Sequence, residues 1–300
     1  MITSFTELLE LAKSKGGKKL AVAVAEDHEV LEAVKMATEL KIVQPILVGD
    51  REKIQTIANE IDFDLTEVKI LDEKDNQLAA REATKLVSSG ECQVLMKGLV
   101  ATATIMKQVL DKEIGLRTGK VISHVAVFNV KTYHKLFFVT DAAMNIGPDL
   151  KGKKEIIENA VELAHSLDVE TPKVAILAAS EKVSPKMEAT VHAEELVQIY
   201  KNGEIDNCIV DGPFALDNAI SKKAAEVKGI DSEVAGDPDI LLVPNIDAGN
   251  VLYKSLTFLA GAESAGIILG TKAPIVLTSR ADNKEAKLHS IALGVLLASK

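Results

Sequence analysis

The chain has 300 residues, of which 47% are hydrophobic and 3% aromatic, and its formal net charge is −9. The acidic balance argues against nucleic acid as a partner, because counterion release requires a basic surface. The lack of Trp and the few aromatic residues also argue against base-stacking platforms. The length suits two domains or one large α/β unit.

The two cysteines, Cys92 and Cys208, lie far apart and have no C-x-x-C partner. This argues against a disulfide framework and a thiolate zinc site, and favours buried free thiols in a reducing cytosol. The apolar run at 20–25 stops at Glu26, and no stretch approaches the length of a membrane span. We therefore expect a cytoplasmic protein that does not cross a membrane.

The first hundred residues alternate short β-branched apolar runs with longer amphipathic stretches. The spacing predicts strands at 20–25, 45–48, 68–71 and 93–96, with helices at 29–40, 51–61, 77–89 and 101–110. Such βαβ repetition is typical of a parallel sheet covered by helices on both faces.

The stretch 119–140 breaks this rhythm. Two strand-like runs, 121–130 and 135–140, are joined by a short hairpin-like link, and we expect a domain boundary just before them. Alternation then resumes with helices at 155–167, 186–202, 216–227 and 250–259 and strands at 174–177, 208–210, 240–243 and 266–269. The last strand, 275–277, leads into a closing helix at 283–299.

Ligands of open α/β sheets bind beyond the carboxyl ends of strands, so these junctions are the candidate sites. After the strand that ends at Met96, Lys97 and Gly98 precede a helix that opens with Thr102 and Thr104. A lysine beside helix-start amides suits a phosphate. An ordinary helix start with a solvated lysine explains these residues equally well.

Two further strand ends carry many amide side chains. Asp141 and Asn145 follow one strand, and the other delivers a second group to a helix start: Asn245, Gly249, Asn250 and Lys254. Turn chemistry explains the neighbouring glycines and proline, but less readily the density of amides. We expect Asp141 and Asn145 to shape a cleft, and the second group to serve partly as cleft wall and partly as helix start.

Several common catalytic motifs are missing from the sequence. It contains no G-x-G-x-x-G fingerprint, no P-loop and no G-x-S-x-G elbow, and its six histidines form no closely spaced pair. NAD-linked chemistry, P-loop chemistry, serine acylation and a zinc site therefore have little support.

The final junction places Ser279, Arg280 and Asp282 between the last strand and the closing helix. On local grounds alone, a helix cap with an exposed arginine explains these residues. The alternative is a site that holds an anion and moves a proton. A planar guanidinium can bind two oxygens of a phosphate, a hydroxyl can donate to a developing oxyanion, and a carboxylate can accept a proton.

Four segments together resemble the phosphate acetyltransferase and phosphate butyryltransferase family. They are FVTDAAMN at 138–145, VPNIDAGNVLYK at 243–254, IILG at 267–270 and LTSR at 277–280. The length, Lys97–Gly98 and the Ser-Arg-Ala-Asp form look more like the butyryltransferase branch.

The resemblance implies reversible transfer of a short acyl group between coenzyme A and inorganic phosphate, with coenzyme A as a substrate, no bound cofactor and no metal. It implies two three-layer α/β domains around a cleft, like isocitrate and isopropylmalate dehydrogenases. The first would comprise 1–122 plus the returning segment 277–300. The second, 123–276, would form a homodimer or higher oligomer.

With the resemblance, the catalytic interpretation of the final junction is favoured. Arg280 is expected to hold phosphate, Ser279 to donate to the acyl oxygen, and Asp282 to accept the thiol proton. Glu285 is the second candidate for the base, because acetyltransferases carry their catalytic aspartate further into the following helix. A phosphate acetyltransferase, a non-catalytic coenzyme A or acyl-phosphate sensor and a dehydrogenase are the competing interpretations.

Overall fold

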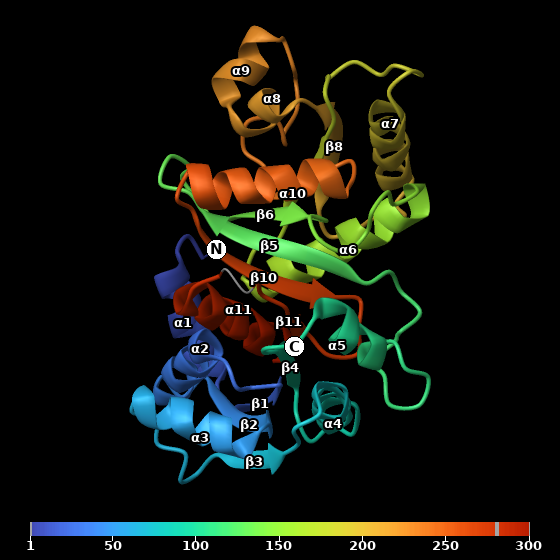
Figure 1. Cartoon of the computed structure of the whole chain (residues 1–300). Helices are drawn as coiled ribbons and strands as arrows, with labels where there is room; N and C mark the ends of the chain where they lie inside the picture. The colour runs from blue at the N-terminus through green and yellow to red at the C-terminus, as the bar shows by residue number, and fades with distance from the viewer. Residues whose placement is uncertain (1, 280–281, 300) are drawn as a thin grey trace. The chain divides into compact units, whose positions relative to one another are not determined.

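The computed structural model describes residues 2–279 and 282–299. The chain forms two compact units. The first unit comprises Phe5–Lys120 and Ala265–Lys300, and the second comprises Met1–Ser4 and Val121–Ser264. Both are α/β structures with a mixed sheet (Figure 1).

The sheet of the first unit has the strand order β3-β2-β1-β4-β11-β10. Its parallel strands are β1 (Lys18–Ala23), β2 (Val43–Gly49), β3 (Lys69–Asp72), β4 (Val94–Lys97) and β11 (Ile275–Val276). β10 (Glu263–Leu269) pairs antiparallel with β11. The chain thus returns to the first unit at Ala265, earlier than the expected residue 277, because β11 completes the sheet beside β4 and carries β10 with it.

The helices of the first unit are α1 (Phe5–Lys15), α2 (His28–Glu39), α3 (Arg51–Glu60), α4 (Asn76–Ser88), α5 (Thr102–Val109) and α11 (Lys284–Leu297). α1, α2 and α11 pack together on one face of the sheet, and α4 and α5 lie together on the other (Figure 1). The sequence did not predict α1, which buries Phe5, Leu8 and Ala12 along one stripe.

The sheet of the second unit has the strand order β5-β6-β9-β7-β8. β5 (Ser123–Asn129) and β6 (Phe137–Thr140) form the predicted antiparallel hairpin. β6 continues in parallel with β9 (Ile240–Leu242), β7 (Lys173–Leu177) and β8 (Ile209–Phe214). Phe128, Val139 and Leu241 are among the buried side chains that form its core.

The helices of the second unit are α6 (Leu150–Ser166), α7 (Glu188–Lys201), α8 (Leu216–Ile220), α9 (Lys222–Val227) and α10 (Ile246–Lys254), followed by the π-helical turn η1 (Ser255–Leu259). The helix expected at 216–227 is broken at Ser221, which is extended and caps α9 by accepting from the Ala224 amide. Within the described residues, no helix has both the length and the apolar character needed to cross a bilayer.

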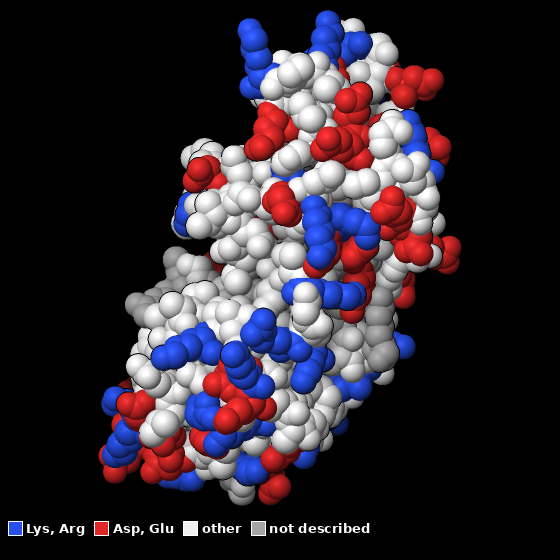
Figure 2. Space-filling model, turned by 90° about the vertical axis from the view of Figure 1, so that its right-hand side faces the viewer, with Lys and Arg blue, Asp and Glu red and all other residues white. Residues whose placement is uncertain are grey.

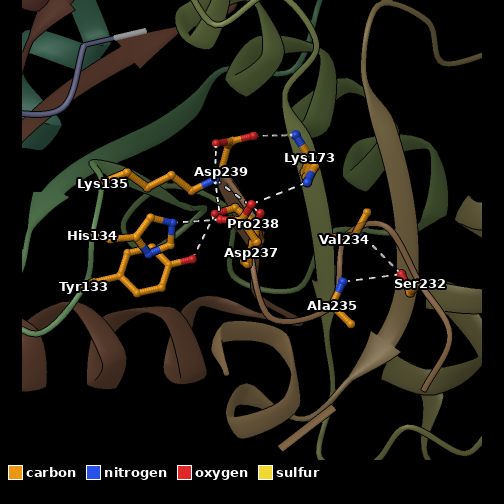
Figure 3. A network of polar contacts seen from close by, with 10 residues as sticks. All are labelled: Tyr133, His134, Lys135, Lys173, Ser232, Val234, Ala235, Asp237, Pro238 and Asp239. Atoms are coloured by element: carbon orange, nitrogen blue, oxygen red, sulfur yellow. Dashed lines mark hydrogen bonds and ion pairs between the residues drawn. The ribbon is translucent and has the colours of Figure 1, made fainter. Parts of the chain in front are cut away.

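A network of polar contacts ties the β5–β6 hairpin to the entrance of β9 (Figure 3). The buried Lys135 ammonium lies 2.6 Å from Asp239 Oδ1 and 3.0 Å from Asp237 Oδ1. The other Asp239 oxygen accepts from the Lys173 amide at 2.8 Å, so the network also reaches β7. These bonds hold the amino ends of neighbouring strands together, at the edge opposite the candidate residues.

Candidate functional site

Ser279 and Asp282 are hydrogen-bonded to each other in the connection between β11 and α11, and we refer to this hydrogen-bonded pair as the turn. The Ser279 amide donates to Asp282 Oδ2 at 2.7 Å, and the Asp282 amide donates back to the Ser279 carbonyl at 3.2 Å. The expected first helical residue, Asn283, is instead the N-cap of α11, and its Oδ1 accepts from the Ala286 amide at 3.0 Å. Arg280, the expected phosphate ligand, lies outside the described residues.

Lys287 is a residue of this junction that the sequence reasoning missed. Its side chain is buried, and its ammonium donates to the Ser279 carbonyl at 3.4 Å and to the Asp282 carbonyl. The available signal was a lysine beside Leu288 and Ile291 in a run of helix that is otherwise mostly apolar.

The two candidate bases differ in their surroundings. Asp282 is half-buried, and its carboxylate is held by the Ser279 amide. Glu285 is exposed in the first turn of α11. The turn therefore fixes the direction of the Asp282 carboxylate, whereas Glu285 extends from the helix surface.

The junction after β4 does not fit the alternative of an ordinary helix start with a solvated lysine. Lys97 is buried, and its ammonium donates to the carbonyls of Gly98 and Val100, each at 3.2 Å. A Cβ at Gly98 would lie 2.1 Å from the Val24 carbonyl oxygen, so the close approach of two backbone segments requires glycine here. Val24 itself has φ +56°, which is rare for a β-branched residue.

α5 begins at Thr102 with Ala101 as its N-cap, and this cap makes no side-chain hydrogen bond. Thr102 is exposed and Thr104 is half-buried in the first turn. The threonines therefore open the helix without serving as its N-cap.

The loop after β6 is organised by Asp141. Its Oδ1 accepts from the amides of Ala143 and Met144 at 2.9 and 3.0 Å, and its Oδ2 accepts from the amide and the side chain of Asn145 at 3.2 and 2.6 Å. Asn145 Nδ2 also donates to the Ile122 carbonyl at 2.9 Å. Because Asp141 is buried and fully engaged, these contacts support the expected shaping role.

α10 packs closely against this loop and starts earlier than predicted, at Ile246. Asn245 caps it by accepting from the Ala248 amide at 3.0 Å. A Cβ at Gly249 would lie 2.8 Å from Ala142 Cα, so only glycine allows this approach. The Asn250 side chain reaches the Ala142 carbonyl at 3.5 Å.

The structure therefore brings five of the six candidates in the second unit together: Asp141, Asn145, Asn245, Gly249 and Asn250. Lys254 is exposed and lies apart from them, at the opposite end of α10.

The surface charge is uneven despite the acidic total. On the face shown in Figure 2, Lys and Arg side chains gather over the first unit, in the lower part of the view, among scattered Asp and Glu. Local basic regions of this kind can attract an anionic substrate to an acidic protein. Among the described residues, no three His, Cys, Asp or Glu side chains gather as metal ligands would.

Comparison with known proteins defines the class. The chain is 51% identical over 300 residues to the phosphate butyryltransferase of Clostridium beijerinckii, covering 100% of this chain and 99% of that protein. It is 47% identical over 292 residues to the phosphate acetyltransferase of Thermotoga maritima, covering 97% and 99%. These relatives are acyltransferases, and so is this protein.

Similar solved structures support the same class of protein. A branched-chain phosphotransacylase from Enterococcus faecalis superposes with a TM-score of 0.82 at 36% identity, covering 94% of this chain and 99% of that one. A protein of Salmonella typhimurium, assigned as a 4-hydroxythreonine-4-phosphate dehydrogenase, shares the fold with a TM-score of 0.60 at 11% identity, covering 94% and 99%. The chain matches the phosphate acetyl/butaryl transferase family over residues 4–84 and 76–295, and it belongs to that family.

Proposed function

We propose that this protein reversibly transfers a short acyl group, butyryl or branched, between coenzyme A and inorganic phosphate. The observation that carries the proposal is the 51% identity to a phosphate butyryltransferase along the whole chain. The superposition on a branched-chain phosphotransacylase supports the extension to branched acyl groups.

The reaction proceeds in a ternary complex without a covalent enzyme intermediate. A phosphate oxygen attacks the thioester carbonyl, a tetrahedral centre forms, and the carbon–sulfur bond then breaks to release the coenzyme A thiolate. Arg280 holds the phosphate, and Ser279 donates to the carbonyl oxygen as negative charge develops. Holding both substrates in one complex supplies much of the acceleration.

In the direction that forms acyl phosphate, the proton that the attacking phosphate loses passes through Asp282 to the departing thiolate. In the reverse direction, Asp282 accepts the thiol proton and passes it to the departing phosphate. Its support is the hydrogen bond from the Ser279 amide, which orients the carboxylate within the same turn as the hydroxyl. Glu285 is the alternative base, one residue into α11.

We infer that the two units are the domains of a dehydrogenase-like fold. The shared fold of the 4-hydroxythreonine-4-phosphate dehydrogenase structure supports this inference. The substrate-binding residues would be Lys97, Gly98, Thr102 and Thr104 in the first unit and Asp141, Asn145, Asn245, Gly249, Asn250 and Lys254 in the second. The buried members act by shaping backbone, as Gly98 and Gly249 do through close packing.

We also infer a cytoplasmic homodimer that associates through the second unit. Supporting evidence is the apolar surface at the end of α10 and in η1, where Val251, Phe258 and Leu259 are 66%, 68% and 85% exposed.

A chain-length profile tests the acyl group. Release of coenzyme A from acetyl-, butyryl- and isobutyryl-coenzyme A is followed in the presence and absence of phosphate. We expect phosphate-dependent release with kcat/KM highest for a four-carbon chain, because each methylene in an apolar pocket changes the rate by about 10–200-fold.

Other outcomes identify the alternatives. Preference for acetyl-coenzyme A indicates a phosphate acetyltransferase, the activity named for the Thermotoga maritima relative. Tight coenzyme A binding without turnover indicates a sensor, and an NAD-dependent absorbance change indicates a dehydrogenase. The Arg280→Ala variant is expected to keep its fold and lose most of its turnover, and near-normal turnover would refute the role of the arginine.

A further inference from the structure

Lys287 is buried in a way that is unusual for a lysine. It is 3% exposed, and lysines are almost never fully buried unless their charge is paired. Among the described residues, no carboxylate forms an ion pair with Lys287. Its ammonium donates to two backbone carbonyls, those of Ser279 and Asp282. The buried charge is therefore satisfied by the turn between β11 and α11.

The direction of these bonds determines which backbone groups of the turn point away from Lys287. Lys287 lies one turn into α11, and helical side chains point back toward the amino end of their helix, here toward the turn. The carbonyl and amide of a trans peptide point in opposite directions. Drawing the Asp282 carbonyl inward therefore turns the Asn283 amide away from Lys287, at the start of α11.

The same contacts concentrate positive charge beneath the turn. The ammonium of Lys287 adds to the partial positive charge at the amino end of α11. Because the site excludes water around this buried side chain, its charge is weakly screened. A doubly charged phosphate bound at the turn would be stabilised more than an uncharged acyl group.

We propose that Lys287 is a positioning residue for the phosphate substrate. It holds the turn that carries Ser279 and Asp282 and adds positive potential beneath it. This inference rests on the proposed phosphate acyltransferase function. If Lys287 only stabilised the fold, its loss would lower thermal stability without changing the affinity for phosphate.

The test is Lys287→Met, which keeps the aliphatic length and removes the charge and the donors. Initial rates are measured while phosphate and butyryl-coenzyme A are varied separately. We expect KM for phosphate to rise about ten- to hundredfold, the range for lost hydrogen bonds to a charged group. KM for butyryl-coenzyme A should stay within about twofold, and Lys287→Arg, which restores the charge, should recover part of the phosphate affinity.

Ser290→Ala is the matched control. Ser290 is buried in the same helix, where its hydroxyl donates to Ala286 and accepts from the Gly266 amide, so its loss perturbs packing without touching the turn. Both KM values should remain near wild type in this variant. The inference is overturned if a folded Lys287→Met protein keeps the wild-type KM for phosphate, or if both KM values rise equally.

Two further measurements separate the possible failures. If Lys287→Met does not fold, Lys287→Gln, which keeps a donor without charge, is judged by the same criteria. If the wild-type protein shows no phosphate-dependent release of coenzyme A, the proposed function fails. Hydrogen exchange would still test whether Lys287 holds the turn in place. Exchange of the Ser279 amide should accelerate at least about tenfold in Lys287→Met and not in Ser290→Ala. Unchanged exchange contradicts the positioning role.

Discussion

Asp141 Oδ2 accepts from Asn145 Nδ2 at 2.6 Å, and the same carboxylate binds three backbone amides of the loop after β6. The carboxylate therefore acts as a template around which the loop folds. Because Asp141 is buried, these donors satisfy its carboxylate oxygens in place of water.

Asp141→Asn should destabilise the second unit and lower activity. The substitution places an NH₂ group among donors and leaves at least one of them unsatisfied. We expect the free energy of unfolding to fall by about 1–3 kcal/mol, measured by urea denaturation. Asp149→Asn is the control, because Asp149 is the N-cap of α6 and asparagine caps equally well. Equal effects of the two substitutions would contradict the template role of Asp141.

The identity of the general base can be resolved by two isosteric substitutions. Asp282→Asn keeps an oxygen that can accept from the Ser279 amide but cannot accept a thiol proton. We expect kcat in the direction that forms acyl-coenzyme A to fall by about 10²–10⁴-fold, the usual contribution of a general base. Glu285→Gln should change kcat by no more than about twofold. The opposite pattern would assign the base to Glu285.

Much of the fold could be predicted from the sequence, because buried parallel strands leave continuous β-branched runs. The antiparallel hairpin of β5 and β6 was recognisable because a short link joins two strand-like runs. The first residues of the helices were predicted less accurately. α6 and α10 begin earlier than their apolar periodicity suggests, because Asp149 and Asn245 act as their N-caps.

The candidate residues could be located from the sequence, but the sequence did not show why the structure requires several of them. Gly98 and Gly249 are required by backbone segments that are distant in sequence, Val24 for the first and Ala142 for the second. The role of Lys287 depends on a turn that folds back over its helix. Such contacts arise from tertiary packing, which periodicity does not encode.

The Lys135–Asp239 pair should dominate the stability of the second unit. Both side chains are buried and their charged atoms are 2.6 Å apart. Lys135→Met leaves the Asp239 charge buried without its cation, so we expect a loss of about 3–5 kcal/mol in the free energy of unfolding. Lys131→Met, an exposed lysine of the same hairpin, should have little effect. A similar small effect at both positions would show that water replaces the Lys135 ammonium.

Asp237 should make this unit sensitive to acid. Burial alone would raise its pKa, but the hydrogen bond and charge of Lys135, then Lys173 and His134, outweigh burial and lower the pKa below 3.8. A lowered folded-state pKa contributes stability that is present above the unfolded pKa and is lost as the pH falls through the folded one. We expect the urea midpoint to fall between about pH 5 and 3, and Asp237→Asn to weaken this dependence. An unchanged pH profile in the variant would exclude Asp237 as the titrating group.

Gly249 should be among the least replaceable positions of α10. An added Cβ would lie 2.8 Å from both Ala142 Cα and Val243 Cγ2 and 2.9 Å from the Asp141 carbonyl, so Gly249→Ala must push α10 away from the loop. We expect the free energy of unfolding to fall by about 1–3 kcal/mol from overpacking, together with reduced turnover because the loop shifts.

Gly147→Ala is the matched control in the same loop, since its Cβ would meet no described heavy atom within 4 Å and its φ is not in the left-handed region. Thermal denaturation and initial rates of both variants measure the difference. If alanine is tolerated at 249, α10 can move without disturbing the residues around Asp141. The position of the helix would then have no role in the proposed site.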